Sequence, residues 1–381
     1  MEKLNTLIEE LSLDYVQFWK EICEIETPSH DKSALDTLVD KLEAHAKAIG
    51  CGVYREKFEK AGDCLRIDLP GDERKQPIVL MAHMDTVHEK GAFGPEPVTI
   101  KDGILYGPGV VDCKNGVTMA FLILEAMKKS GVSHPPIRVL FTSDEEISAR
   151  LSGEQGIAFF ETHAKGAKAV LNCETGADGV LTVGRKGITN LRLTITGKAS
   201  HAGGAYFSGA SAIREAAHKI LAIEAMSKPD GETFNCGIIY GGTKTNIVPE
   251  RCVVEVDVRS LEERGMEKAV EQVKSIAARS YVEGTSCTVE VLSVRPPMTH
   301  TDANRDLLRR INEIAVRHGQ KAMSEFVSGG GSDAAYTTRM GIPTICSIGP
   351  YGWDCHTSKE RAVAASLPER AKLVAWCILE L

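Results

Sequence analysis

Short apolar runs that alternate with helical segments constrain the fold of the first half of this chain more than any other feature. The helical segments cover about 3–25, 31–49 and 116–129, and the apolar runs cover 65–70, 77–83, 137–143 and 168–173. Runs of this length suit buried strands, and strands that alternate with helices indicate an α/β sheet covered on both faces. In such sheets, functional residues collect where the strands end and the loops begin.

The hydrophobic pattern changes near residue 185. The segment ITNLRLTITG at 188–197 alternates strictly between apolar and polar residues, as a half-exposed antiparallel strand does. After it the pattern predicts a helix at 208–226, strands at 233–240 and 251–259, a helix at 264–281 and a strand at 285–294. This order is the split βαβ arrangement. We therefore predict an α+β open-faced sandwich at 185–294, inserted into an α/β domain made of 1–184 and 295–381.

The α/β character then resumes toward the end of the chain. The pattern predicts a helix at 302–318, strands at 323–327 and 343–348, and a final helix at 366–380. The total length of 381 residues agrees with two or three domains.

Composition limits the class of protein. With 43% hydrophobic and 25% charged residues, the chain is not disordered. Its 45 basic and 52 acidic residues give a net charge of −7, without the Lys/Arg cluster that a nucleic-acid partner requires. No apolar run approaches the roughly 20 residues of a membrane span, and the acidic amphipathic N-terminus resembles no signal or transit peptide. We expect a cytoplasmic protein that binds neither nucleic acid nor membrane.

The eleven cysteines are irregularly spaced, and none forms a Cys-x-x-Cys pair. A disulfide framework or a cysteine zinc site would show a regular pattern. Most of these cysteines lie in apolar runs, where free Cys packs as a small hydrophobic residue. We expect free thiols in a reducing compartment.

Side chains that bind metals recur where the predicted strands end. Each has an ordinary structural explanation: a His after a strand is usually hydrogen-bonded, paired Glu residues are usually solvated, and an Asp before a helix is usually an N-cap. Together, however, two His and three carboxylates suit zinc, and a shared carboxylate suits two ions about 3.5–4 Å apart. The candidates are His83 and Asp85 in MAHMDTV, Asp112 in GVVDCKNG, Glu145 and Glu146 in FTSDEEIS, Glu174 in LNCETG, and His356 in GWDCHTSKE.

The order of the motifs points to a family. HMDTV, GPGVVDCKNG, SDEE, the Glu174 turn, GKASHAG, NIVPE followed by VEVDVRS, GGGSDA and CHTSKE occur in one order. From about residue 70 to the C-terminus, the chain resembles the aminoacylase and glutamate carboxypeptidase family of dinuclear-zinc metallopeptidases. The resemblance implies a mixed-sheet, zinc exopeptidase-like catalytic domain. It also implies that the inserted domain serves as a lid and as a dimerisation domain.

The resemblance also implies roles for the candidate residues. His83, Asp112 and Glu174 would bind one Zn²⁺, and Asp112, Glu146 and His356 the other, with Co²⁺ able to substitute. Glu145 would be the general base. Asp85, two residues from His83 and therefore on the same face of a strand, would hold its imidazole.

The substrate class follows from the same resemblance. In this family, Glu rather than Asp at position 174 accompanies aminoacylase and carboxypeptidase types. Arg259 would bind a substrate carboxylate, Asn246 would contact the substrate, and His201 would donate to the oxyanion. Without the motifs, the simplest interpretation is that Arg259 is a surface residue of a strand and that His201 is a turn residue near the start of a helix. The implied reaction is hydrolysis of an amide bond next to a free C-terminal carboxylate, in an N-acyl amino acid or a short peptide.

Two alternatives stay open at this point. An aminopeptidase or a di- or tripeptidase of the same superfamily would use the same zinc pair but bind a substrate amine. The second alternative is a non-catalytic zinc-binding relative. Such a protein should have lost the general base or a metal ligand, whereas this sequence has Glu145 and all five candidate ligands.

Four further expectations come from the resemblance. The peptide bond between Asp112 and Cys113 should be cis. The chain should form a homodimer through 185–294, unless charged residues protect the exposed strand edge. Asn115 replaces a Gly that is usual in the family, and 147–156 departs from the usual short Gly-rich turn, so both segments are expected to be placed differently.

Overall fold

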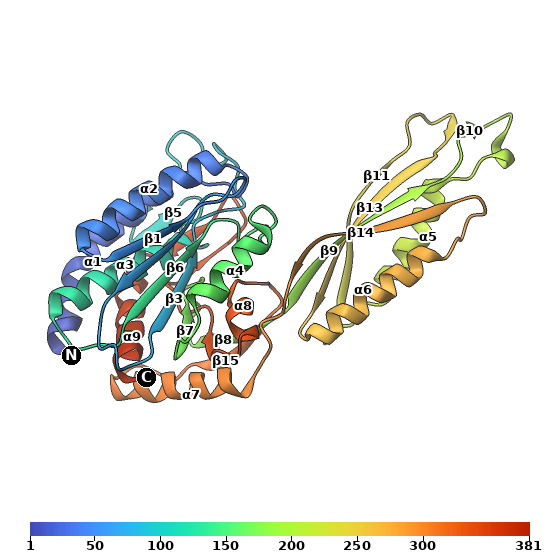
Figure 1. The fold of residues 1–381 in the computed structure, drawn as a ribbon. Helices are drawn as coiled ribbons and strands as arrows, with labels where there is room; N and C mark the ends of the chain where they lie inside the picture. Colours follow the sequence, from blue (N-terminus) through green and yellow to red (C-terminus); the bar gives the residue numbers. More distant parts are fainter. The chain divides into compact units, whose positions relative to one another are not determined.

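The computed structural model describes residues 1–381 and separates the chain into two compact units. Unit 1 consists of Met1–Gly184, His300–Val327 and Ser332–Leu381, and unit 2 consists of Arg185–Thr299 with Ser328–Gly331. Figure 1 shows unit 1 as helices packed around one sheet and unit 2 as a sheet covered by helices on one face.

Unit 1 is built on a six-stranded mixed sheet. Its strand order is β1 (Gly52–Glu56), β2 (Cys64–Leu69), β6 (Ile137–Thr142), β3 (Ile78–His83), β7 (Ala169–Asn172) and β16 (Thr344–Ile345). Strands β6, β3, β7 and β16 are parallel to one another, whereas β2 pairs antiparallel with both β1 and β6. Every residue of β3 is buried, as the unbroken apolar run predicts for a central parallel strand. The sheet confirms the predicted mixed α/β architecture.

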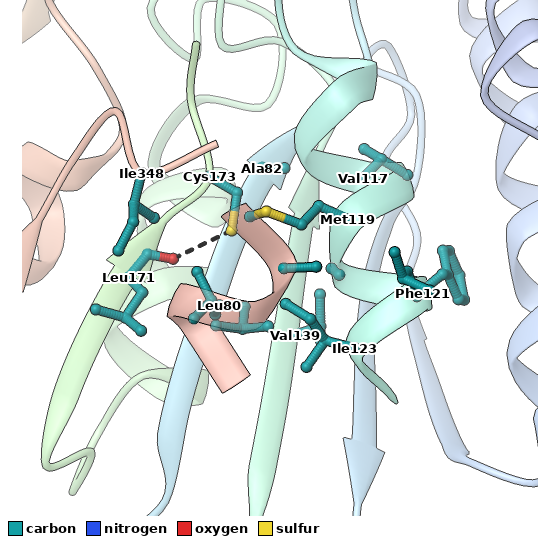
Figure 2. Packing of buried hydrophobic residues seen from close by; sticks show 14 of the residues in the cluster. Leu80, Ala82, Val117, Met119, Phe121, Ile123, Val139, Leu171, Cys173 and Ile348 are labelled. Carbon is teal, nitrogen blue, oxygen red and sulfur yellow. Dashed lines mark hydrogen bonds between the residues drawn. The ribbon is translucent and has the colours of Figure 1, made fainter. Parts of the chain in front are cut away.

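Helices cover both faces of this sheet. Alternate residues of β3 belong to two different cores: Leu80 packs in the larger one and Met81 in the smaller one. Figure 2 shows Leu80 and Ala82 beside the helix that carries Val117 and Met119. The larger core includes residues of α1 (Glu2–Cys23), α2 (Lys32–Ile49), α3 (Lys114–Ser130), α7 (Asp302–Arg317) and α9 (Ser366–Glu380), and the smaller core includes residues of α4 (Gly153–His163) and α8 (Ala334–Arg339).

Several short elements in unit 1 were not predicted from the sequence, including α4 and α8. A small antiparallel sheet has the order β17 (Gly352–Trp353), β18 (Arg361–Val363), β5 (Ile104–Tyr106) and β4 (Thr99–Lys101). Strands of two or three residues are too short to show a hydrophobic period. The predicted strand at 343–348 is shorter than expected, because only Thr344–Ile345 pair with β7. Strands β8 (Val180–Arg185) and β15 (Ser324–Ser328) pair with each other.

Unit 2 has the predicted split βαβ order. Its antiparallel sheet runs β11 (Thr233–Gly241), β13 (Arg251–Ser260), β9 (Gly187–Thr196) and β14 (Ser286–Arg295). Helices α5 (Ala212–Glu224) and α6 (Glu263–Ala278) pack on one face, where Leu191, Leu193 and Ile195 of β9 are buried. Strands β10 (Ser200–His201) and β12 (Ile247–Val248) pair beside η1 (Tyr206–Ser208). No helix in the chain has the length and apolar character that crossing a membrane would require.

Candidate active site

Three neighbouring parallel strands bring candidate ligands to one edge of the unit 1 sheet. Because β3 pairs in parallel with β6 and with β7, the carboxyl ends of all three strands meet there. The segment before α3 and the loop between β17 and β18 supply two more side chains. The residues that these segments carry are His83 and Asp85 (β3 and its end), Glu145 and Glu146 (after β6), Glu174 (after β7), Asp112 (before α3) and His356 (between β17 and β18).

The carboxylate of Asp112 lies between the two imidazoles. Its Oδ1 is 3.1 Å from His83 Nε2, and its Oδ2 is 3.1 Å from His356 Nε2. His83 Nε2 also lies 3.9 Å from Glu174 Oε2, and His356 Nε2 lies 3.3 Å from Glu146 Oε2. Asp112 therefore joins the two imidazoles, and the ligand atoms of His83, Asp112 and Glu146 also lie within 4.8 Å of one another.

Asp85 is fully buried and joins two of the strand ends. Its Oδ1 is 3.2 Å from His83 Nδ1 and accepts a hydrogen bond from the Glu145 backbone N–H at 3.1 Å. Its Oδ2 accepts from the Glu146 N–H at 3.1 Å and from the Ser29 hydroxyl at 2.7 Å. Burial alone would raise the pKa of Asp85, but these partners hold it below its usual range. Asp85 thus orients one imidazole and also holds the backbone of two adjacent glutamates.

The charges of these side chains favour a bound cation. Glu146 Oε1 is buried without a hydrogen-bond partner, which is costly for a carboxylate unless a positive charge compensates it. Burial, with the nearby Asp112 charge, raises the pKa of Glu146 to about 8. Hydrogen bonds to Asp112 and Glu146 raise the pKa of His356 to about 11. Two imidazoles and three carboxylates are a donor set that suits zinc, so the residues present fit a metal centre.

One more donor lies close to this set. The Cys113 thiol has its sulfur within 4.8 Å of ligand atoms of His83 and Glu174. Burial raises the pKa of this thiol well above its usual value, and Glu174 adds to the rise, so the neutral form is favoured. The sequence motifs did not single out this residue as a ligand.

The start of α3 is fitted tightly against the end of β7. The Asp112–Cys113 peptide bond is cis, as the resemblance predicted. A Cβ at Gly116 would lie 2.2 Å from the Cys173 carbonyl oxygen, so only glycine allows this approach. The unusual Asn115 is fully buried, and its Nδ2 donates to the Pro350 carbonyl at 3.1 Å. Its side chain therefore links α3 to the segment that leads to the His356 loop.

The unusual segment after Glu146 is organised by Asp144. The Asp144 carboxylate accepts hydrogen bonds from the backbone N–H groups of Leu151 and Ser152, at 3.1 and 2.8 Å, and from the Ser152 hydroxyl at 2.9 Å. Within the turn, Ser148 and Ala149 adopt φ angles of 60° and 53°. Asp144, directly after β6, therefore holds this segment in a closed turn.

The motif GGGSDA contributes side chains whose positions the sequence did not predict. Ser332 donates to Glu174 Oε1 at 3.2 Å and accepts from Asn172 at 2.8 Å. Asp333 accepts from the Thr142 hydroxyl at 2.8 Å. Together with His83, Glu145 and Glu174, residues Asn172 and Asp333 line one small enclosed space. The motif itself was the only signal in the sequence for these contacts.

The three remaining candidates lie in unit 2. His201 is exposed in β10, and its Nδ1 accepts hydrogen bonds from the Gly203 and Gly204 N–H groups at 3.1 and 3.0 Å. A neutral imidazole that accepts at Nδ1 carries its proton on Nε2, which is then a donor. Asn246 lies beside it, because its carbonyl accepts from the Ala202 N–H at 3.0 Å.

Arg259 lies in β13 of the four-stranded sheet, whereas His201 lies in the separate two-stranded sheet of β10 and β12. Arg259 pairs across β13 and β9 with Ile188, near the start of β9, whereas Arg251 pairs with Thr196 at the end that leads to His201. Arg259 lies eight positions along the strand from Arg251, which corresponds to about 26 Å. The Arg259 guanidinium is held by Asp257, 2.8 Å from Nε, and by the Gly329 carbonyl, 2.9 Å from Nη1.

Known proteins resemble this chain over most of its length. The Peptidase family M20/M25/M40 matches residues 79–380. Carboxypeptidase G2 of Pseudomonas sp. (strain RS-16) is 31% identical over 369 residues, which cover 95% of this chain and 88% of that protein. A succinyl-diaminopimelate desuccinylase of a Nitratiruptor species is 26% identical over 293 residues, covering 73% of this chain and 77% of that protein.

Solved structures have the same fold over nearly the whole chain. Aminopeptidase PepT from Bacillus cereus has a TM-score of 0.76 and 25% identity, covering 96% of this chain and 98% of that one. A tripeptidase from Staphylococcus aureus has a TM-score of 0.79 and 24% identity, covering 96% and 97%. The second likeness concerns the fold alone.

Proposed function

Because this chain belongs to the peptidase family M20/M25/M40 and is a metallopeptidase-type hydrolase, we propose that it cleaves an amide bond next to a free C-terminal carboxylate. The substrate would be an N-acyl amino acid or a short peptide. The observation that carries the hydrolytic part of the proposal is Asp112, placed with one carboxylate oxygen toward His83 and the other toward His356. The preference for a free carboxylate is supported by the likeness to carboxypeptidase G2.

Two zinc ions fit the donor set, and Co²⁺ could substitute. We assign His83, Asp112 and Glu174 to one ion, and Asp112, Glu146 and His356 to the other. When bound, such a pair supplies a water of lowered pKa and polarises the scissile carbonyl.

The proton transfers fall to Glu145. Its neighbour Glu146 faces His356 at 3.3 Å and is assigned to the metal, while Glu145 lines the space shared with His83 and Glu174. Glu145 accepts the proton of the attacking water and delivers it to the leaving amine. Asp85 keeps Glu145 in place through its backbone N–H.

Arg259 is proposed to bind the substrate carboxylate, and His201 to donate Nε2–H to the oxyanion, with Asn246 beside it. About 26 Å of strand separates the two ends of β13, so one copy of unit 2 does not present both Arg259 and His201 to one small substrate. The proposal therefore places His201 and Asn246 in the active site of a second copy of the chain.

The edge of the unit 2 sheet supports a homodimer. Edge strand β11 exposes Ile238, Ile239 and Tyr240 by 52, 52 and 55%. An exposed apolar edge strand invites pairing with an identical edge across a two-fold axis. The alternative is a monomer whose edge is protected by charged neighbours.

Substrate choice tests the proposed reaction. We expect the zinc-loaded protein to hydrolyse an N-acetyl amino acid and a carboxylate-terminated dipeptide, and to hydrolyse the corresponding C-terminal amide only at a low residual rate. An aminopeptidase or tripeptidase, as the likeness to PepT allows, would instead require a free N-terminal amine. Cleavage that depends on the amine and tolerates the C-terminal amide would refute the proposal. Inactivity in a broad screen would favour the non-catalytic alternative, although the base and all five ligands are present.

Arg259→Ala should lower kcat/KM by roughly 10–100-fold for the carboxylate substrate, since a hydrogen bond to a charged group contributes about 1.5–3 kcal/mol. The same change should have little effect on residual hydrolysis of the C-terminal amide. Arg251→Ala, at the exposed far end of the same strand, is the matched control and should leave both rates unchanged. An equal loss with both substrates would remove Arg259 from carboxylate binding.

Subunit mixing tests whether His201 acts in the second copy. His201→Ala and Glu145→Gln should each be inactive, and mixing them with subunit exchange should restore partial activity, because one mixed site contains both intact residues. Analytical ultracentrifugation gives the oligomeric state. A fully active monomer would end the dimer proposal, and a dimer with proven exchange but no recovery would end the role in trans.

A further inference from the structure

We infer that Glu360 and His88 are positioning residues for the metal centre: their contact joins the three segments that carry His83, Asp112 and His356. The inference rests on the proposed function, since it concerns how this chain holds its proposed ligands. None of the sequence motifs assigned a role to either residue.

Glu360 binds the backbone of the shared ligand directly. Its side chain is 1% exposed, and its Oε1 accepts hydrogen bonds from the N–H groups of Val111 and Asp112, at 2.9 and 3.1 Å. The Glu360 carbonyl also accepts from the Gly107 N–H at 3.3 Å. Because these hydrogen bonds hold the main chain at Val111 and Asp112, they fix the position of the Asp112 backbone from which its carboxylate extends.

Glu360 also belongs to the loop that carries His356. It follows His356 by four residues, and its N–H donates to the Thr357 carbonyl at 3.2 Å, which closes a turn between them. Two kinds of contact therefore join the His356 loop to the Asp112 segment. One is the contact of 3.1 Å between His356 and Asp112, and the other is the pair of hydrogen bonds from the Val111 and Asp112 N–H groups to Glu360.

His88 brings in the third segment. It lies five residues after His83 in the same connection, and its Nε2 is 2.7 Å from Glu360 Oε2. A nitrogen that faces a carboxylate is the donor, so the proton lies on Nε2. The ring packs edge-on against Phe93 at 4.9 Å between centroids, which holds it in place. With Oε1 occupied by two backbone donors, His88 is the partner of the other buried oxygen.

Loss of the His88 donor should therefore weaken the hold of Glu360 on Asp112. Without His88, Glu360 Oε2 would be buried without a hydrogen-bond partner, which costs free energy. The Glu360 carboxylate would then rotate toward water, and its hydrogen bonds to the Val111 and Asp112 N–H groups would be lost. The ligands would remain present but less well placed. Changes to groups that support metal ligands typically reduce metal affinity 10–100-fold.

The test compares zinc binding by purified full-length variants. His88→Phe keeps a ring against Phe93 but removes the N–H donor, and His88→Gln restores a donor. Competition with a chromophoric chelator should show Zn²⁺ bound 10–100-fold more weakly by His88→Phe, with most of the affinity recovered in His88→Gln. Where His88→Phe does not fold by circular dichroism, His88→Ala serves the same comparison without added bulk.

A second histidine–carboxylate pair provides a matched control. His318 contacts Glu380 through Nε2 and stacks on Trp376 at 4.4 Å, away from the candidate ligands. His318→Phe should leave zinc affinity at the wild-type value. The inference is overturned by a folded His88→Phe or His88→Ala with wild-type zinc affinity, or by an equal loss in His318→Phe. A wild-type chain that binds no zinc would instead overturn the proposed metal centre itself.

Discussion

Glu145→Gln is expected to lower kcat/KM about 10²–10⁴-fold while zinc content stays at the wild-type level. The substitution keeps the size of the side chain and removes the proton acceptor. The five residues assigned to the metals are untouched, and the Glu145 N–H still donates to Asp85. The measurement is steady-state kinetics on the zinc-loaded protein, together with metal analysis of the same preparation.

The control for this experiment is Glu154→Gln. Glu154 is an exposed carboxylate in the first turn of α4, outside the candidate site, so its loss should change neither rate nor metal content. A Glu145→Gln protein with intact metal and near wild-type turnover would contradict the assignment of the general base. A fall in zinc content would instead make Glu145 a ligand.

Asp112→Ala is expected to lose bound zinc at both positions and activity with it. Its two carboxylate oxygens lie 3.1 Å from different imidazoles, so the side chain is the only one assigned to both ions. The loss of zinc affinity should exceed the 10–100-fold that is typical of residues outside the ligand set. Chelator competition and metal analysis after gel filtration measure it.

Asp306→Ala serves as the control for this change, since Asp306 is an exposed carboxylate on α7 that pairs with Arg309. It should bind zinc as the wild type does. Full dinuclear occupancy in Asp112→Ala would show that the carboxylate is not shared. The two predictions also separate the two roles, because Glu145→Gln should lose turnover alone and Asp112→Ala should lose metal and turnover together.

The larger elements of the fold could be predicted because their hydrophobic periods are long and uninterrupted. The alternating segment predicted at 188–197 is β9 (Gly187–Thr196), and the buried run predicted at 77–83 is β3 (Ile78–His83). The predicted helix at 116–129 begins two residues earlier, at Lys114, directly after the cis bond. Strands β17 and β18 were not predicted, because strands of two or three residues are too short to show an alternation of apolar and polar residues.

The placement of several candidate residues could be predicted to a similar degree. His83, the Glu145–Glu146 pair and Glu174 follow apolar runs, and a parallel sheet gathers such strand ends at one edge. His88 and Glu360 are 272 positions apart in the chain, and Ser29 and Asp85 are 56 apart. No local pattern marks such pairs, because their contact depends on how distant segments pack.

The sequence by itself therefore determined which residue types stand at the strand ends and in what order, since local apolar periods decide where strands stop. Only the tertiary structure decided that the two oxygens of Asp112 face different imidazoles, and that Asp85 bonds the backbone of both glutamates. It also placed Arg259 at the end of β13 opposite to the end from which the chain continues, after β9, to His201. The physical reason is that a side chain's direction and its long-range partners are set by the packing of whole elements, which no short stretch of sequence contains.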